Sequence, residues 1–224
     1  DKLKSGIFII IPKSDHERAK HFTDPNKLKS IFIIKQKLNS IFIINETDIK
    51  KYKLGFCDNG VYQNRIIIPS YDADGQLNYF VSRAFYKHDT QKHKNPQVSK
   101  DIIGFEMLIN WNEPIILCEG SFDAITIKRN AIPLFGKIIQ PMLQKKIIEE
   151  RVKDVYICLD NDAIRNALNI AERFMAEGLN VHFIELKDKD PNELGYKKIT
   201  EQIQDTYKFS FERMMELKMN SLWK

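Results

Sequence analysis

Short apolar runs alternate with amphipathic stretches along the second half of the chain. Runs of four to seven apolar residues predict strands, and apolar positions three or four residues apart predict helices. The strands are predicted at 114–120, 132–136, 154–160 and 180–186, and the helices at 121–130, 140–152, 162–178 and about 197–219. Pro141 suits the first turn of its helix, Ser121 lies near an N-cap, and Gly178 suits a C′ position. Short strands alternating with helices favour an α/β fold with a mostly parallel sheet and helices on both faces.

The middle of the chain has a different pattern. The stretch "NRIIIPSY" at 64–71 predicts a strand, "DADG" a turn, and residues 76–85 a returning strand. The aromatic residues Tyr79, Phe80 and Phe85 of the returning strand could stack on nucleic acid bases, although hairpin core is the alternative that we favour. A polar loop follows to about residue 100. A small β-rich (α+β) subdomain is therefore expected before the parallel sheet.

A basic head followed by an apolar tail recurs near the N-terminus, at 2–10, 27–34 and 37–44. The irregular spacing excludes a solenoid period. We expect four regions: a repetitive segment at 1–45, the β-rich subdomain at 46–110, the α/β domain at 111–196 and a C-terminal helical segment at 197–224.

Composition places the chain among globular proteins that do not cross membranes. It has 224 residues, of which 43% are hydrophobic and 29% charged. The apolar runs are too short to span a bilayer, and no signal peptide is evident. Cys57, Cys118 and Cys158 form no C-x-x-C pair, which argues against a zinc knuckle or a disulfide framework. We expect Cys118 and Cys158 to be buried thiols in a protein of the cytoplasm.

The net charge of +5 is mild, but it is unevenly distributed. Residues 1–60 hold 12 Lys and Arg against 7 Asp and Glu, which already accounts for it. Within 83–100, Asp89 is the one acid among five basic residues: Arg83, Lys87, Lys92, Lys94 and Lys100. This basic segment precedes an acidic centre in the sequence. The separation of the two charges along the chain says more about possible ligands than the net charge does.

Carboxylates follow three of the predicted strands. Asp160 and Asp162 come after "VYICL", Glu119 after "IILC", and Asp188 and Asp190 after "VHFIEL". Two acids at i and i+2 of a strand point to the same face, and at about 6 Å they repel by on the order of 3 kcal/mol. Ligands bind beyond the carboxyl ends of parallel strands. The pattern predicts a site for Mg²⁺ or Mn²⁺; the alternative is that these acids merely cap helices and face solvent.

These acids lie within motifs that resemble a known domain. "CEGSFDAI" followed by "LDND" resembles the Toprim signature, E-G-x-x-D and then D-x-D, over roughly residues 113–195. That domain is shared by bacterial-type DNA primases, type IA and type II topoisomerases and some nucleases. The flanks resemble primases: "RIIIPSYDADGQLNYFVSRAF" matches their pattern at Arg65, Pro69, Asp72, Gly75, Phe80 and Arg83. "KHKNP" matches at Lys92 and Asn95, with His93 in place of Tyr, and "DIIGFE" matches at Gly104.

The resemblance implies the RNA-polymerase core of a bacterial or phage-type DNA primase, which synthesises short RNA primers on single-stranded DNA from ribonucleoside triphosphates. It implies Glu119, Asp160 and Asp162 as catalytic metal ligands for Mg²⁺ or Mn²⁺, supported by Asp190 and Asp123, and nucleotide or nucleic-acid contacts from Arg65, Arg83, Lys92 and Asn95. Glu119 could instead transfer protons. Asp123 could instead be an acid of the first helical turn. A replicative helicase is the expected partner, in the cytoplasm of a bacterium or of a phage host.

The chain departs from primases in three respects. Asn192 replaces the second acid of a D-P-D segment, no zinc-binding module precedes the core, and the repeats replace most of its N-terminal half. Two further functions therefore stay open: a Toprim nuclease, and a non-catalytic module that binds DNA or a helicase. A topoisomerase is disfavoured because no nucleophilic Tyr in a separate domain is recognisable.

Overall fold

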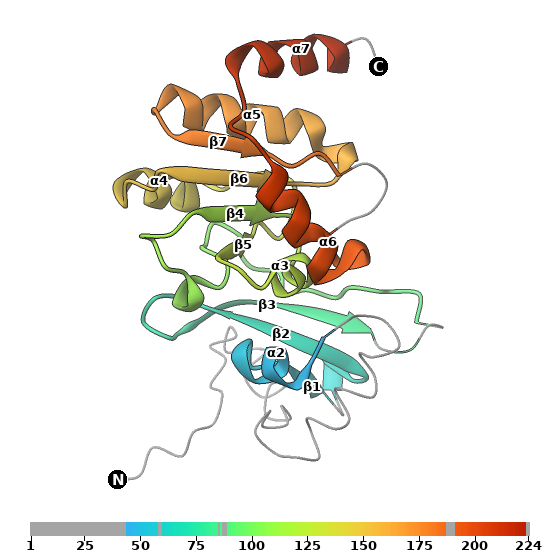
Figure 1. Ribbon diagram of the computed structural model, residues 1–224. Coiled ribbons are helices and arrows are strands. Elements are labelled where there is room, and N and C mark those ends of the chain that lie inside the picture. Colours follow the sequence, from blue (N-terminus) through green and yellow to red (C-terminus); the bar gives the residue numbers. More distant parts are fainter. Residues whose placement is uncertain (1–43, 58–59, 85, 87–88, 187–190, 223–224) are drawn as a thin grey trace. The chain divides into compact units, whose positions relative to one another are not determined.

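The computed structural model describes residues 44–57, 60–84, 86, 89–186 and 191–222 (Figure 1). The chain divides into two compact units, Asp1–Ser99 and Lys100–Lys224. The repeats at 2–10 and 27–34, and all of the third repeat except Ile44, lie outside the described residues. No helix in the described ranges is long and apolar enough to cross a membrane.

The first unit contains helix α2 (Glu46–Lys51) and an antiparallel sheet with the strand order β1-β2-β3. The strands are β1 (Gly55–Cys57), β2 (Arg65–Tyr71) and β3 (Leu77–Ala84). The turn between β2 and β3 is built by Asp72, whose Oδ1 accepts hydrogen bonds from the backbone N–H groups of Asp74 (3.1 Å) and Gln76 (2.8 Å). Gly75 has a φ of 77°, a conformation that favours glycine. The predicted hairpin is confirmed.

Aromatic side chains of β3 belong to the core of this unit. Tyr79 and Phe80 are each only 2% exposed. The Phe80 ring packs with Cys57 and Ile67, and meets the Tyr62 ring edge-on at 5.1 Å between centroids. The interpretation as hairpin core is therefore confirmed for Tyr79 and Phe80, while Phe85 lies outside the described residues.

The second unit is built around a parallel sheet with the strand order β5-β4-β6-β7 (Figure 1). Its strands are β4 (Ile115–Cys118), β5 (Ala131–Pro133), β6 (Asp154–Cys158) and β7 (Asn180–Phe183). Its helices are α3 (Ser121–Ile127), α4 (Pro141–Glu149), α5 (Ile164–Ala176), α6 (Pro191–Asp205) and α7 (Phe211–Leu222). Helix α3 packs against α6, and α5 against α7. This arrangement confirms the predicted α/β fold class.

Local sequence signals explain where most of these helices begin and end. Helix α4 begins at Pro141, and Gly178 follows the end of α5 with a φ of 81°. Ser121 lies near the N-cap of α3, as predicted: Gly120 is the N-cap, and Ser121 is the first helical residue and is buried. One detail differs from the prediction, because helix α5 begins at Ile164 and residues 161–163 form a separate 3₁₀ turn.

The segment 100–110 belongs to the second unit, although the prediction grouped it with the β-rich subdomain. Ile103 is 3% exposed and packs in the same core as Ile132 and Leu134. Gly104 lies so close to β5 that a Cβ atom there would be 2.5 Å from the backbone oxygen of Pro133. Only glycine permits this approach, which fixes the segment to the edge strand of the parallel sheet.

Candidate metal centre and basic hairpin

Three carboxylates meet at the carboxyl ends of two neighbouring strands. In the parallel pair β4 and β6, Cys118 lies opposite Cys158, so the residues that follow both strands emerge at the same edge of the sheet. Glu119, Asp160 and Asp162 each place one carboxylate oxygen within 4.8 Å of the others. We call these three residues the acidic cluster. The structure thus brings together the three principal metal ligands expected from the sequence.

A turn, and not a strand, groups the two aspartates. Strand β6 ends at Cys158, and Asp160 is the extended N-cap residue of the 3₁₀ turn Asn161–Ala163, with φ −63° and ψ 155°. The N–H of Ala163 donates to the carbonyl of Asp160 at 2.8 Å and closes the turn. The expectation that Asp160 and Asp162 share one face of a strand is therefore wrong. Asp162 lies inside the turn, and its side chain is 71% exposed.

The environment of Glu119 in the acidic cluster disfavours negative charge. Burial raises the pKa of its carboxyl group, and the negative charges of Asp160 and Asp162 raise it further, while Lys137 and a backbone hydrogen bond at Asp160 oppose the shift. Its Oε1 atom is buried and has no hydrogen-bond partner among the described residues. A buried, unpaired carboxylate oxygen is costly, so a cation at this position would stabilise it.

Lys137 brings a positive charge to the acidic cluster, and sequence reasoning missed it. Its ammonium forms a hydrogen bond and an ion pair with Asp162. This hydrogen bond raises the pKa of Lys137, and the charges of Glu119, Asp162 and Asp160 add to the shift. The sequence shows only that Lys137 follows "IPLFG", a predicted strand, and the folded sheet is needed to place this strand beside β4.

The residues present fit a hard divalent cation such as Mg²⁺ or Mn²⁺. The acidic cluster offers only oxygen ligands, which such ions prefer. The nearby thiols do not change this set, because burial raises the pKa values of Cys118 and Cys158 and keeps both protonated. Both cysteines are buried and free, as predicted. At separations below 5 Å and an effective dielectric of about 20, each carboxylate pair repels by on the order of 3 kcal/mol, which a divalent cation would offset.

The supporting ligands are placed differently. The Oδ2 atom of Asp123 accepts a hydrogen bond from the backbone N–H of Gly120 at 3.0 Å, and Asp123 is not a member of the acidic cluster. Its alternative interpretation, an acid in the first turn of α3, matches this contact. Asp190 lies outside the described residues. Asn192, which replaces an acid of the primase pattern, accepts a hydrogen bond from Thr126 Oγ1 at 3.5 Å and so links α6 to α3.

In the first unit, Arg65 organises the loop that follows β3. Its guanidinium is nearly buried, pairs with Asp89 at 3.0 Å, and donates to the backbone oxygens of Gln91 (2.8 Å) and Lys92 (3.5 Å). Asn95 binds the same loop to β3, because its Oδ1 accepts from the backbone N–H of Ser82 at 3.2 Å. Both residues therefore have internal partners, and their predicted contacts with nucleotides stay predictions.

Arg83, Lys92 and His93 form the basic surface of this hairpin. Nη1 of Arg83 lies 2.9 Å from Nε2 of His93, and the Lys92 side chain is exposed. His93 is exposed at the surface, but partial desolvation of its ring lowers its pKa, and the positive charges of Arg83, Arg65 and Lys92 lower it further. A neutral His93 can accept the hydrogen bond from Arg83, so the histidine orients this guanidinium without adding charge.

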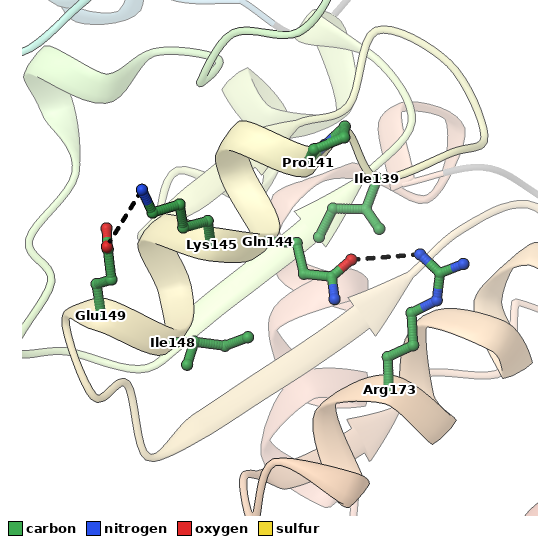
Figure 2. A pocket seen from close by; sticks show the side chains of 7 residues that line it. All are labelled: Ile139, Pro141, Gln144, Lys145, Ile148, Glu149 and Arg173. Atoms are coloured by element: carbon green, nitrogen blue, oxygen red, sulfur yellow. Dashed lines mark hydrogen bonds and ion pairs between the residues drawn. The ribbon is translucent and has the colours of Figure 1, made fainter.

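Among the described residues of the second unit, two hollows bear on the search for a site. One, of about 260 Å³, adjoins the acidic cluster at Asp160 and is lined partly by the apolar side chains of Phe183 and Leu217. The other, of about 360 Å³, lies beside α4 and is bordered by two exposed polar pairs (Figure 2). These are Lys145 with Glu149, at 3.5 Å, and Arg173 with Gln144, at 3.3 Å. The second hollow is lined by none of the acidic cluster residues.

The family model described as "Toprim-like" matches residues 116–195, which include the acidic cluster. The uncharacterized protein MG010 of Mycoplasma genitalium is 30% identical over 153 residues, which cover 63% of this chain and 69% of that protein. The DNA primase of the same organism is 26% identical over 208 residues. That match covers 84% of this chain but 34% of the primase, so the chain spans about a third of that relative.

Solved structures show the same fold. The DnaG primase catalytic domain bound to single-stranded DNA matches with a TM-score of 0.68 and 18% identity, over 84% of this chain and 74% of that one. The Escherichia coli primase catalytic core matches with a TM-score of 0.68 and 16% identity, over 89% of this chain and 80% of that one. At these identities the likeness establishes the fold, which is that of primase catalytic cores.

Proposed function

Because the chain belongs to the family of MG010 and carries a Toprim-like domain in a primase fold, we propose that it is the catalytic core of a DNA primase. In this proposal it synthesises short RNA primers on single-stranded DNA by metal-dependent nucleotidyl transfer from ribonucleoside triphosphates. The observation that carries the proposal is the acidic cluster, three carboxylates at the ends of β4 and β6. A replicative helicase as partner is part of the proposal and rests on the family resemblance alone.

Glu119, Asp160 and Asp162 would hold Mg²⁺ or Mn²⁺, which when bound neutralises phosphate charge and stabilises the attacking and leaving oxygens. Proton transfer is the alternative role for Glu119. The pKa of its carboxyl group is raised in the metal-free protein, so a Glu119 that does not bind the metal ion is a better base than an exposed glutamate and can accept a proton from an attacking hydroxyl. Asp190 remains a proposed supporting ligand.

The basic hairpin would bind the phosphates of the nucleotide or the template. We assign this contact to Arg83 and Lys92, because Lys92 is exposed and Arg83 is oriented by His93. Arg65 and Asn95 would instead position the loop that carries Lys92. Arg65 donates to the backbone oxygen of Lys92, and Asn95 connects the loop to β3. Removal of either should therefore affect nucleotide affinity and local stability together.

The test is incorporation of labelled ribonucleotides by the full chain on a single-stranded DNA template, with Mg²⁺ or Mn²⁺. We compare the wild type with Asp160→Asn, which removes one charge from the acidic cluster and keeps the shape of the side chain. Asp205→Asn is the matched control, because this exposed aspartate lies at the end of α6. The proposal expects short RNA products with the wild type and the control, and at least ~100-fold less product with Asp160→Asn.

Other outcomes identify the alternatives. Metal-dependent cutting of the template without synthesis, lost in Asp160→Asn, would indicate a Toprim nuclease. Neither synthesis nor cutting, with retained DNA binding and no uptake of Mn²⁺ in calorimetry, would indicate a non-catalytic module. Equal synthesis by the wild type and Asp160→Asn would show that the acidic cluster is not the centre of the reaction.

A further inference from the structure

The loop after β5 is attached to the residues that precede the acidic cluster. The N–H of Leu134 donates to the carbonyl of Cys118 at 2.8 Å, and the N–H of Gly136 donates to the carbonyl of Glu119 at 3.2 Å. The loop therefore follows the backbone of β4 up to Glu119 itself. Lys137 is the next residue, so its position is determined by the same strand end that supplies Glu119.

Further contacts fix this loop from its other side. The ammonium of Lys100 donates to the carbonyl of Phe135 at 2.7 Å, and the Phe135 ring meets the Phe105 ring edge-on at 6.3 Å between centroids. Phe135 has a φ of 51°, in the left-handed region that costs an ordinary residue about 1–2 kcal/mol. A strained backbone held by several contacts is a feature of functional loops. These contacts fix the backbone just before Lys137, so its side chain starts from a fixed position beside the acidic cluster.

The ion pair that Lys137 makes is exposed, and this makes it exchangeable. The Lys137 side chain is 38% exposed and that of Asp162 is 71% exposed, and exposed ion pairs contribute little to stability. The buried pair of Arg65 and Asp89 is the opposite case, because the Arg65 side chain is 5% exposed and also binds two carbonyl oxygens. A lysine is also a compact charge on a flexible stem, which can leave and return without moving the backbone.

We propose that Lys137 is an internal cation that occupies the acidic cluster in the metal-free protein, is displaced by a divalent metal ion, and then contacts the phosphates of the bound nucleotide. The first step concerns the metal-free and metal-bound protein only. The second step rests on the proposed function. Lys137 thereby lowers metal affinity and raises nucleotide affinity, two effects of opposite sign from one side chain.

The first experiment measures Mn²⁺ binding by calorimetry in the full chain without nucleotide. We compare the wild type, Lys137→Gln, Lys137→Arg and Lys145→Gln, the last being a matched control because the Lys145 side chain is 75% exposed and pairs with Glu149 beside the second hollow. Removing the competing ammonium should tighten Mn²⁺ binding about 3- to 10-fold in Lys137→Gln. Lys137→Arg and Lys145→Gln should stay within about twofold of the wild type.

Thermal unfolding gives a second readout that does not depend on activity. In chelator, Lys137→Gln should unfold at a slightly lower temperature than the wild type, because the exposed ion pair contributes little but the three carboxylates lose a compensating charge. Added Mn²⁺ should then raise its melting temperature by more than it raises that of the wild type. Lys145→Gln should show neither difference.

The second experiment measures binding of a non-hydrolysable ribonucleoside triphosphate at saturating Mn²⁺. Lys137→Gln should bind it about 3- to 10-fold more weakly, while Lys145→Gln should match the wild type. Unchanged triphosphate affinity in Lys137→Gln would overturn the second step. Unchanged or weaker Mn²⁺ binding in Lys137→Gln would overturn the first step and leave the proposed function intact. Absence of Mn²⁺ uptake by the wild type would overturn the metal centre itself.

Discussion

Charged side chains are used in opposite ways in the two units of this protein. In the first unit, Arg65 is nearly buried, and its guanidinium is paired with Asp89 and two backbone oxygens, so its charge is compensated within the fold. In the second unit, Glu119, Asp160 and Asp162 bring like charges within 4.8 Å of one another. The Oε1 atom of Glu119 is buried without a partner in the described part of the chain.

This difference separates a structural charge from a functional one. Arg65 improves the stability of the fold, because the Asp89 carboxylate and the carbonyls of Gln91 and Lys92 gain a partner from it. The acidic cluster works against stability, because its members repel one another and Lys137 compensates only part of the charge. A fold that tolerates such repulsion gains a place where a cation binds strongly. The contrast leads to mutations whose effects on activity and on stability have different signs.

Glu119→Gln should produce the largest effect. Without this carboxylate the acidic cluster loses a metal ligand, and ribonucleotide incorporation should fall at least ~100-fold. In chelator the same variant should be more stable than the wild type, because a partly buried charge that repels Asp160 and Asp162 is removed. The measurements are primer synthesis with Mn²⁺ and thermal unfolding in chelator.

Glu201→Gln is the control for this prediction, because Glu201 is an exposed glutamate of α6. It should change neither quantity. If Glu119→Gln lost stability in chelator, the acidic cluster would be a structural feature like the Arg65 pair, and the contrast between the units would fail.

Arg65→Met should give the next largest effect, with the opposite sign for stability. The variant keeps most of the side-chain volume but leaves the Asp89 carboxylate and the Gln91 carbonyl without their partner. The free energy of unfolding of the first unit should fall by about 3 kcal/mol. Hydrogen exchange of the β2 and β3 amides in the full chain measures it. Arg213→Met, which removes two exposed ion pairs from α7, should change stability little, and an equal loss there would contradict the special role of Arg65.

Most of the fold could be predicted because its signals are local. The apolar runs, Pro141 and Gly178 place strands and helices without any knowledge of distant contacts. The 3₁₀ turn after β6 could not be predicted in this way. The two residues that follow Cys158 also fit a strand, so the sequence "VYICLDND" does not show where β6 ends. The place of segment 100–110 depends on contact between Gly104 and Pro133, which lie far apart in the sequence.

In the candidate site, too, some features follow from local sequence signals and others depend on contacts between distant residues. Glu119, Asp160 and Asp162 could be grouped from the sequence, because the ends of parallel strands share one edge of a sheet. The internal pairing of Arg65 could not be predicted from the sequence. Its partner Asp89 lies in a loop, and the stretch "NRIIIPSY" does not show that the Arg65 side chain is buried. Lys137 was missed because its role depends on which strand lies beside β4, and that order appears only in the folded sheet.

Lys92→Ala should separate binding from stability within the first unit. The Lys92 side chain is exposed, so its removal should change the free energy of unfolding by less than about 0.5 kcal/mol. Binding of single-stranded DNA should weaken a few-fold, and the slope of log affinity against log salt should decrease by about 0.7. Fluorescence anisotropy over a salt series measures both. Lys50→Ala, in the exposed pair with Glu46 on α2, is the control, and an equal change in slope there would reduce Lys92 to one of many surface charges.

His93→Gln should give the smallest effect, visible as a change in pH dependence. Partial desolvation and the charges of Arg83, Arg65 and Lys92 hold the pKa of the exposed His93 below its value of about 6.5 in an unfolded chain. As the pH falls below 6.5, the unfolded chain therefore takes up a proton before the folded one, and the stabilising contribution present at higher pH is lost. Urea unfolding of the wild type should show a lower midpoint at pH 5.5 than at pH 7.5, and this decrease should be smaller in His93→Gln. Equal decreases in both proteins would mean that His93 titrates alike in the folded and unfolded chain, so that the basic hairpin would not be as tightly organised around Arg83 as its contacts indicate.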